Sequence, residues 1–322
     1  MDEQLLAHLR ATDSLRIREH ALLSEYTRFG IGGPADVVVD AHSETSMIAA
    51  LEAIRGAGLP LEVIGEGSNL VVSDSGFRGA ILRYRGSAIT IEGKRVEAAA
   101  GAVLQTLVDE TIAHGLAGVH TMTGIPGSVG AAVYGNAGAY GRSISQSVSN
   151  VRYYDGATVQ VSLNTGCEFH YRESIFKQNK QWVILSTGLS LETGDADELR
   201  RKADSIRKIR DEKYPPTMRC AGSIFKNLLL TQLDSTVQSQ VPEQVVREGK
   251  VPAAWFLDEA GVKGMRSGGI EVAEYHANLI YNAGGGTAAD LRAVIASCKN
   301  RVHDRFGLML EEEVQFIGFS NE

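Results

Sequence analysis

Cysteine and proline are scarce in this sequence. Three cysteines (Cys167, Cys220 and Cys298) and seven prolines occur among 322 residues. The cysteines are odd in number, widely spaced and without a C-x-x-C pair, which argues against a disulfide framework and a structural zinc site. This usage is compatible with a reducing compartment, so we expect no bound metal and a cytoplasmic location.

Long charged runs and long apolar runs are also missing. The net charge is −7, from 32 basic and 39 acidic residues, and the densest basic segment, 200–210, is interleaved with Asp204 and apolar side chains. This pattern does not favour nucleic-acid binding. No stretch comes near the roughly 18 consecutive apolar residues of a membrane span, and the N-terminus lacks the apolar run of a signal peptide. We therefore expect no membrane association, and we infer no obligate protein partner.

Glycine is the residue in excess. The chain has 35 glycines, about 11% against a usual 7% or so, and eight of them fall between Gly115 and Gly141. Glycine allows positive φ and lets a ligand approach the main chain closely. With 43% hydrophobic and 22% charged residues the composition is that of a soluble globular protein, and the length predicts two or three domains.

Hydrophobic spacing predicts an α+β protein, because helices and strands alternate without a regular βαβ period. Helices are expected at 2–10, 44–56, about 102–114 and 195–213, and from the cap Thr287 to the stop Gly307. Strands are expected at 36–40, 61–64, 70–72, 80–82, 89–91, 95–99, 148–154, 158–163, 182–191 and 314–319, with a hairpin turn at Asp155-Gly156. Tyr214-Pro215-Pro216 ends the charged helix and is the best domain boundary.

Two glycine segments are candidates for a ligand site. Gly65-Glu-Gly67-Ser68-Asn69 lies between two apolar strands, where its amides can converge on an anion, although an ordinary hairpin loop explains it equally well. The segment from Thr123 to Gly141 is too rich in glycine for a stable helix. It suits a backbone that lies against a flat or phosphorylated ligand.

Several known motifs fail on inspection. Gly30–Ala35 has the G-x-G-x-x-A skeleton of a dinucleotide fingerprint, but a strand rather than a helix is predicted to follow it. No P-loop pattern occurs. Ser-Ile-Phe-Lys stands at both 174–177 and 223–226, yet the S-D-N and K-T-G elements that accompany Ser-x-x-Lys in penicillin-binding proteins are absent. Serine acyl transfer is therefore disfavoured.

Taken in order, these segments resemble the UDP-N-acetylenolpyruvoylglucosamine reductases, flavoenzymes of peptidoglycan precursor synthesis. The resemblance covers roughly residues 26–318. The matching segments are Thr27–Ala35, Gly65–Leu70, Thr123–Gly130, Asn136–Gly141, Tyr171–Lys177, Ala221–Asn227, Gly269–Asn282 and Glu313–Gly318. Single motifs are shared with other flavoproteins of the vanillyl-alcohol-oxidase-like fold, but the ordered set is specific to this family.

The resemblance implies a two-part FAD-binding region of the vanillyl-alcohol-oxidase/PCMH type, followed by a smaller α+β substrate-binding domain. The implied boundaries are 1–85 and 86–193 for the two FAD-binding subdomains and 205–319 for the substrate domain. It implies non-covalent FAD, NADPH as hydride donor and UDP-N-acetylenolpyruvoylglucosamine as substrate. The implied cofactor-binding residues are Gly65, Gly67, Ser68, Asn69, Gly124, Ile125, Pro126, Gly127 and Ser128.

The resemblance also implies the catalytic groups. Ser223 matches the proton donor, while Arg172 and Glu313 match the residues that stabilise the enolic carboxylate intermediate. A serine is a poor acid in water, so its surroundings must assist it; Lys226 is near in sequence, but its direction is not fixed by the sequence. The implied substrate-binding residues are Lys213, Asn227, His276, Tyr171 and Tyr140.

The chain departs from the family pattern in small ways. Gly130-Ala131 replaces a glycine pair, and Leu228 stands where a proline is usual. The short spacing from Arg172 to Ser223 leaves no room for the tyrosine-bearing lid insertion of one subclass, so the chain resembles the insertion-free second type. Two alternatives stay open: another FAD-dependent oxidase or dehydrogenase of this fold that acts on a small alcohol, and a flavin-free module that binds sugar nucleotides.

Overall fold

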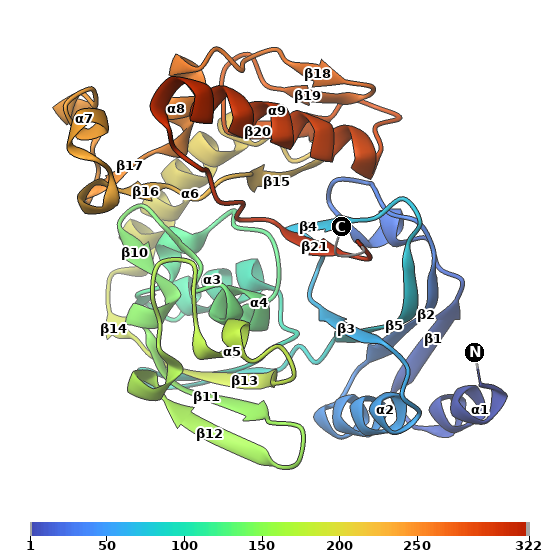
Figure 1. The fold of residues 1–322 in the computed structure, drawn as a ribbon. Helices are drawn as coiled ribbons and strands as arrows, with labels where there is room; N and C mark the ends of the chain where they lie inside the picture. Colours follow the sequence, from blue (N-terminus) through green and yellow to red (C-terminus); the bar gives the residue numbers. More distant parts are fainter. Residues whose placement is uncertain (1, 320–322) are drawn as a thin grey trace. The chain divides into compact units, whose positions relative to one another are not determined.

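The computed structural model describes residues 2–319, which form two compact units (Figure 1). Unit 1 contains the described residues of 2–21, 35–67 and 78–212, and unit 2 contains those of 22–34, 68–77 and 213–319. Two short segments from the first quarter of the chain therefore belong to the same unit as its last third. The mixture of helices and sheets confirms the predicted α+β class.

The first sheet of unit 1 has four strands in the order β1-β2-β5-β3. The strands are β1 (Leu15–Glu19), β2 (Ala35–Ala41), β5 (Phe77–Tyr84) and β3 (Leu61–Ile64). Helices α1 (Glu3–Ala11) and α2 (Glu44–Gly56) bury apolar side chains against it, including Leu9 and Leu51. Since β2 begins at Ala35, the last residue of the Gly30–Ala35 motif, a strand stands where the dinucleotide fingerprint requires a helix, and that interpretation is excluded, as the sequence predicts.

The second sheet of unit 1 has five antiparallel strands in the order β12-β11-β13-β7-β6. The strands are β12 (Val159–Leu163), β11 (Val148–Tyr154), β13 (Val183–Ser190), β7 (Arg95–Ala99) and β6 (Ile89–Glu92). Helices α3 (Leu104–Ala113) and α4 (Val129–Tyr134) lie on one face (Figure 1), and α5 (Ile175–Gln178) and α6 (Ala196–Lys213) complete the main helices. Two small ribbons pair β8 (Leu116–Ala117) with β14 (Glu192–Thr193) and β9 (Gly138–Ala139) with β10 (Arg142–Ser143).

Helix α4 corrects the expectation that the glycine-rich segment holds no stable helix. Its first turn is capped by Ser128, whose Oγ accepts from the Ala131 amide at 3.3 Å. A Cβ on Gly130 would lie only 2.7 Å from the Cβ of Ala100, so the glycine permits close packing. Four of the six residues of α4 are buried, and this packing outweighs the cost of about 1 kcal/mol for a helical glycine.

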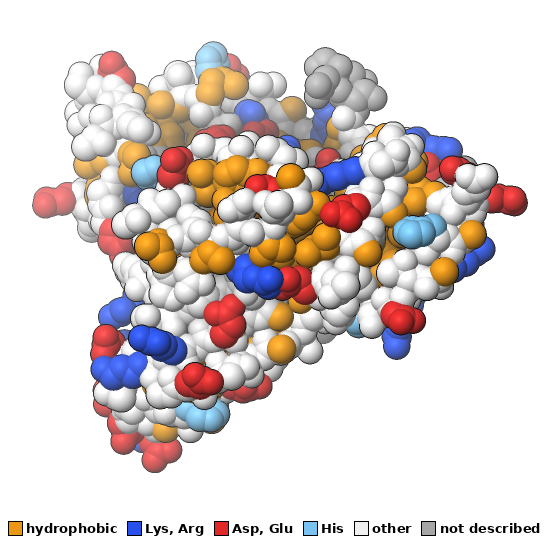
Figure 2. All heavy atoms as spheres, turned by 90° about the horizontal axis from the view of Figure 1, so that it is seen from below, with side chains coloured by type: hydrophobic (Ala, Val, Ile, Leu, Met, Phe, Trp, Pro, Cys, Tyr) orange, Lys and Arg blue, Asp and Glu red, His pale blue; other side chains and the backbone are white. Residues whose placement is uncertain are grey.

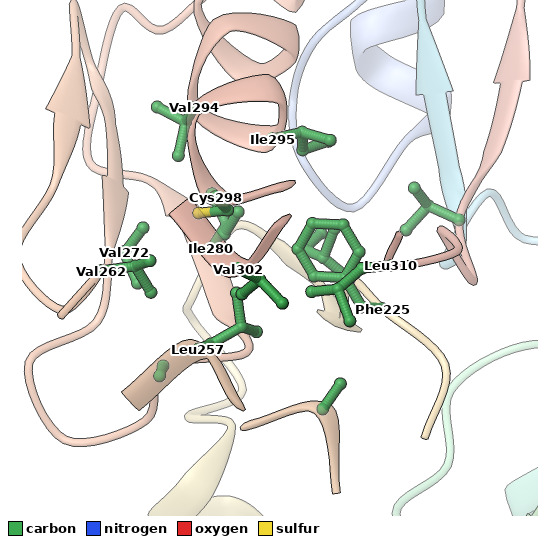
Figure 3. Packing of buried hydrophobic residues seen from close by; sticks show 14 of the residues in the cluster. Phe225, Leu257, Val262, Val272, Ile280, Val294, Ile295, Cys298, Val302 and Leu310 are labelled. Carbon is green, nitrogen blue, oxygen red and sulfur yellow. The ribbon is translucent and has the colours of Figure 1, made fainter. Parts of the chain in front are cut away.

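The central sheet of unit 2 has the strand order β15-β20-β19-β18. The strands are β15 (Cys220–Ser223), β20 (Leu279–Asn282), β19 (Ile270–Val272) and β18 (Arg266–Ser267). Helices α8 (Ala253–Glu259) and α9 (Ala288–Phe306) pack on it, and Figure 3 shows apolar side chains of α9 beside those of α8, β19 and β20. The short elements are α7 (Ser235–Gln238) and the ribbon of β16 (Leu228–Leu229) with β17 (Lys250–Val251).

Unit 2 also contains a parallel pair formed by β4 (Leu70–Val72) and β21 (Gln315–Ile317). The sequence predicts β4 as the second half of a strand–loop–strand segment that begins with β3, and an ordinary hairpin is one interpretation of that loop. The hairpin reading is wrong, because β3 pairs with β5 and β4 pairs with β21. The loop between β3 and β4 therefore connects two different sheets.

The surface carries charges of both signs. Figure 2 shows one face, on which acidic and basic side chains are interspersed and hydrophobic side chains gather near the centre. On β12, at the edge of the five-stranded sheet, Val161 and Leu163 are 63% and 68% exposed. Among residues 2–319, no helix has both the length and the apolar character needed to cross a membrane.

Candidate functional site

Gly65 and Ser128, one from each predicted cofactor loop, lie close together in unit 1. A Cβ added to Gly65 would lie 3.0 Å from Oγ of Ser128 and 3.3 Å from Cβ of Ala131. Gly65 is thus the residue that allows the loop after β3 to approach the start of α4. Gly67 has φ +64, a left-handed conformation that favours glycine, so it turns the same loop sharply.

The second loop, Gly124–Ser128, has backbone amides available to a ligand. Gly124 (φ +73) donates its amide to Oε1 of Gln105 at 2.7 Å, which fixes the loop at one end. Across the described residues, the amides of Gly127 and Ser128 donate to no protein acceptor. Free amides next to each other in a glycine loop are typical of an anion-binding backbone.

Basic side chains of α6 lie against this loop. The position that a Cβ would take on Gly124 is 3.0 Å from Cδ of Arg207 and 3.2 Å from Cδ of Arg210. Arg207 is oriented by Asp211, whose carboxylate accepts from its Nε at 3.0 Å. A larger residue at 124 would displace these arginines, so the loop combines free amides, positive charge and minimal side-chain bulk. This combination fits the phosphates and the flat ring of a dinucleotide.

Arg172 stands at the tip of a tight turn in unit 1. His170 and Glu173 exchange backbone hydrogen bonds of 3.0 and 3.2 Å, which closes the turn and leaves Arg172 with φ +60. Its guanidinium donates to the carbonyl of Gly138 at 3.3 Å and lies 5.2 Å from the centre of the Tyr171 ring. The turn therefore holds the guanidinium against the backbone of β9.

The side chains of Asn136 and Lys177 support that turn. Asn136 donates from Nδ2 to the carbonyl of His170 at 2.8 Å. Lys177 donates to the carbonyl of Arg172 at 2.9 Å and to the carboxylate of Glu173 at 2.7 Å. Each of these polar side chains thus orders the backbone on which Arg172 stands.

Ser223 ends β15 directly after a β-bulge. Cys220 pairs with Tyr281 and Ser223 with Leu279, so two residues of β15 stand opposite one residue of β20. Gly222, inside the bulge, has φ +78, and a Cβ there would meet no atom within 4 Å. Glycine is needed at 222 for its backbone conformation alone. The bulge changes the direction of the strand at the serine.

A buried asparagine fixes the segment after Ser223. Asn278, only 2% exposed, accepts from the amide of Phe225 with Oδ1 and donates to its carbonyl with Nδ2, both at 2.9 Å. Its own carbonyl accepts from the amide of Ile224 at 3.1 Å. The side chain of Asn278 thus replaces a missing β-ladder partner.

Glu313 belongs to the same hydrogen-bonded region of unit 2. Its amide donates to the carbonyl of Ile224 at 2.7 Å, so its backbone is bonded to the residue next to Ser223. Its carbonyl accepts from Nδ2 of Asn69 at 3.0 Å, and Gln315 donates to the carbonyl of Asn69 at 2.9 Å. Asn69, which the resemblance assigns to the cofactor, therefore holds the backbone of Glu313.

Two predicted substrate-binding residues lie around Tyr214. Nζ of Lys213 is 5.0 Å from the centre of the Tyr214 ring, and the ring of His276 is 6.3 Å from it. Burial, and then the positive charge of Lys213, lower the pKa of His276 to about 4. His276 is therefore neutral at physiological pH. Oη of Tyr214 lies 3.1 Å from Oγ of Ser223.

Asn227 and Tyr140, the other predicted substrate-binding residues, each take part in local structure. Oδ1 of Asn227 accepts from the amide of Ala253 at the start of α8, at 3.2 Å. Tyr140 is 47% exposed and turns the β9–β10 ribbon with φ +53. Lys226 forms an ion pair of 2.5 Å with Glu311.

Sequence reasoning missed three contributions in unit 2. The sequence marks Tyr214 only as the end of a helix and contains Asn278 only within a longer motif. The resemblance assigns Asn69 to the cofactor and not to the backbone of Glu313. The structure identifies Asn278 because this polar side chain is buried next to the strand that carries Ser223. No local pattern identifies the partners of these side chains, because the partners lie far along the chain.

Family models match both parts of the chain. The model of an FAD binding domain matches residues 35–161, and that of the UDP-N-acetylenolpyruvoylglucosamine reductase C-terminal domain matches residues 214–317. Together with the glycine loops, these matches define an FAD-dependent oxidoreductase with an added C-terminal domain.

Relatives cover almost the whole chain. A UDP-N-acetylenolpyruvoylglucosamine reductase of Solibacter usitatus is 56% identical over 310 residues, which are 96% of this chain and 99% of the relative. One of Rubrobacter xylanophilus is 35% identical over 92% of this chain and 93% of its own. The crystal structure of the corresponding enzyme of Thermus caldophilus matches with a TM-score of 0.74 and 27% identity, over 94% of this chain and 99% of that one. The chain belongs to the UDP-N-acetylenolpyruvoylglucosamine reductase family.

This membership confirms the predicted fold class and FAD as the cofactor. The relatives do not favour the small-alcohol oxidase that the sequence left open. The domain boundaries and the individual site residues stay predictions, since no relative tests them residue by residue.

Proposed function

We propose that this protein reduces UDP-N-acetylenolpyruvoylglucosamine to UDP-N-acetylmuramate, a step of peptidoglycan precursor synthesis, with NADPH as the reductant. FAD, when bound, would supply the hydride transfer from NADPH to the enolpyruvyl double bond. The proposal assigns non-covalent binding of FAD to the loops at 65–69 and 124–128. The free amides of Gly127 and Ser128 and the adjacent arginines of α6 support that assignment.

Ser223 is the proposed proton donor. Hydride addition to the double bond leaves an electron pair on the carbon next to the carboxylate. The Oγ–H bond of Ser223 breaks, and its proton forms a C–H bond with that electron pair. The observation that carries this role is the position of Ser223 at the end of a bulged strand, where the bonds of Asn278 and Glu313 to the following two residues fix its backbone.

Arg172 and Glu313 are the proposed stabilisers of the enolic carboxylate intermediate. A fixed guanidinium stabilises negative charge best where that charge grows, and the His170–Glu173 turn fixes Arg172. Lys213, Asn227, His276, Tyr171 and Tyr140 are proposed to bind the substrate. We also propose a cytoplasmic location, which the absence of disulfides among the described cysteines supports.

The experiment separates the two half-reactions by anaerobic stopped-flow absorbance of the flavin. NADPH should bleach the oxidised flavin, and UDP-N-acetylenolpyruvoylglucosamine should then restore it. UDP-N-acetylglucosamine, which lacks the double bond, is the matched control and should restore nothing. A colourless protein that FAD cannot reconstitute, or a reduced flavin that the enolpyruvyl substrate does not reoxidise, would contradict the proposal.

A further inference from the structure

The hydroxyl of Ser223 has a tyrosine as its neighbour. Oη of Tyr214 lies 3.1 Å from Oγ of Ser223, and either oxygen has the geometry to donate. Lys226, the basic residue closest in sequence, instead pairs with Glu311 at 2.5 Å. Both hydroxyls belong to unit 2, with Tyr214 directly after α6 and Ser223 at the end of β15. The group in place to assist Ser223 is therefore a phenol.

We propose that Tyr214 is a positioning residue for Ser223 that also resupplies its proton during the reduction of the substrate. The inference rests on the proposed function. A phenol is a far stronger acid than an aliphatic alcohol. If Ser223 alone gave up a proton it would be left as an alkoxide, whereas with Tyr214 behind it the negative charge moves to the phenol oxygen.

The proton movements balance in this arrangement. The Oγ–H bond of Ser223 breaks as the C–H bond of the product forms, with the electron pair that hydride addition left on the carbon. The Oη–H bond of Tyr214 breaks, and its proton goes to Oγ of Ser223. Tyr214 is then a phenolate, and water returns a proton to it after product formation. No further oxidant or reductant is needed.

The surroundings of Tyr214 suit a transient negative charge. Nζ of Lys213 is 5.0 Å from the ring centre and attracts the phenolate. His276, whose ring lies 6.3 Å away, has a pKa lowered to about 4 and stays neutral, so it does not protonate the phenolate in place of water. Tyr275 is the other polar ring nearby, and its hydroxyl donates to the carbonyl of Lys213 at 3.1 Å.

The test is Tyr214→Phe in the FAD-loaded enzyme, with the reoxidation of the reduced flavin measured in mixtures of H2O and D2O. Reduction by NADPH should be unchanged, and reoxidation by the enolpyruvyl substrate should slow by about tenfold or more. The wild-type rate should curve with the fraction of D2O, because two protons move. The rate of Tyr214→Phe should fall on a straight line, because one proton moves. A purely structural role would not change that shape.

Tyr275→Phe is the matched control, since it removes one hydroxyl whose hydrogen bonds go to Lys213 and Met218, on either side of Tyr214, rather than to Ser223. It should keep both the rate and the curved dependence. Reoxidation of Tyr214→Phe at the wild-type rate, a curved dependence in that variant, or equal losses in both variants would each overturn the role of Tyr214 and leave the proposed function standing. If the wild-type enzyme is not reoxidised by the substrate, the proposed function fails and this inference fails with it.

Discussion

The tetrapeptide Ser-Ile-Phe-Lys occurs once in each unit and has a different structure in each. In unit 1, Ser174 precedes α5, is fully buried, and donates its hydroxyl to the carbonyl of Tyr134 at 2.8 Å. In unit 2, Ser223 ends β15, and its hydroxyl lies beside that of Tyr214. Phe176 and Phe225 are both buried in the cores of their own units.

The difference teaches that the neighbours, rather than the tetrapeptide, decide what the serine does. Each copy buries its phenylalanine, so the local sequence meets the same hydrophobic requirement twice. The hydroxyl of Ser174 donates its hydrogen bond to a main-chain carbonyl, so its role is structural. The hydroxyl of Ser223 faces another hydroxyl, which can exchange a proton with it. The predictions below test this contrast from its largest consequence to its smallest.

The largest effect is expected for Ser223→Ala. Flavin reduction by NADPH should stay nearly intact, while reoxidation by the enolpyruvyl substrate should fall by about a hundredfold to ten-thousandfold, the range of general acid catalysis. Anaerobic stopped-flow absorbance measures both steps. If the two half-reactions slowed equally, Ser223 would not be the proton donor.

Asn278→Ala should have the next largest effect, because it removes the side chain that is hydrogen-bonded to the backbone of Phe225 in the tetrapeptide of unit 2. The buried amide and carbonyl of Phe225 lose their hydrogen bonds, at about 1–3 kcal/mol each. Reoxidation should also slow, by up to about a hundredfold, since small displacements of reacting groups cost that much. Urea unfolding and stopped-flow absorbance measure the two effects.

Asn282→Ala is the control for Asn278→Ala. Asn282 is 6% exposed and also bonds to the main chain, donating to the carbonyl of Phe29 and accepting from the amides of Gly284 and Gly286. The hydrogen bonds of its side chain go to residues other than Ile224 and Phe225, which Asn278 holds. It should lose comparable stability and keep the reoxidation rate. Equal slowing in both variants would mean that general destabilisation, rather than the position of Ser223, explains the loss.

Elements with local causes could be predicted from the sequence. Helix α9 begins at its cap Thr287, which accepts from the amide of Asp290, and ends at Gly307 with φ +69, both as predicted. The hairpin at Asp155-Gly156 is confirmed by the pairing of β11 with β12, and the carboxylate of Asp155 closes it through the amides of Ala157 and Thr158. These signals act over a few residues, so the sequence contains them completely.

Elements with distant causes could not be predicted. Strand β4 pairs with β21 from the other end of the chain, and no residue pattern in either segment predicts this pairing. Helix α4 forms because Gly130 packs closely on Ala100, which outweighs a poor helix propensity. The residues of the candidate site also differ in whether the sequence could predict them. The family resemblance supplied Ser223 and Glu313, but the roles of Tyr214 and Asn278 depend on contacts that only folding creates.

Ser174→Ala tests the comparison at the serine of unit 1. The variant leaves the carbonyl of Tyr134 without the hydroxyl donor of the fully buried Ser174, so the free energy of unfolding should fall by about 1–3 kcal/mol. Both half-reactions, measured per molecule of bound flavin at a temperature where the variant is folded, should match the wild type. A selective loss of reoxidation in Ser174→Ala would mean that the two serines are not functionally distinct.

The smallest effect concerns His276, whose ring lies near that of Tyr214. The pKa of His276 falls from its ordinary 6.5 to about 4 in the folded protein, chiefly through burial. Between pH 4 and 6.5 the unfolded chain therefore binds a proton that the folded protein does not. His276 should contribute its full stability above pH 6.5 and lose it as the pH falls towards 4. His276→Gln should remove this part of the pH dependence.

Urea unfolding of the wild type and His276→Gln at several pH values from 4.5 to 8 measures the difference. The stability of the variant relative to the wild type should rise as the pH falls and level off above about pH 6.5. A difference that stays constant with pH would mean that His276 titrates alike in both states. His276 would then be able to carry a proton in the folded protein near Tyr214, which would contradict the statement that it does not protonate the phenolate.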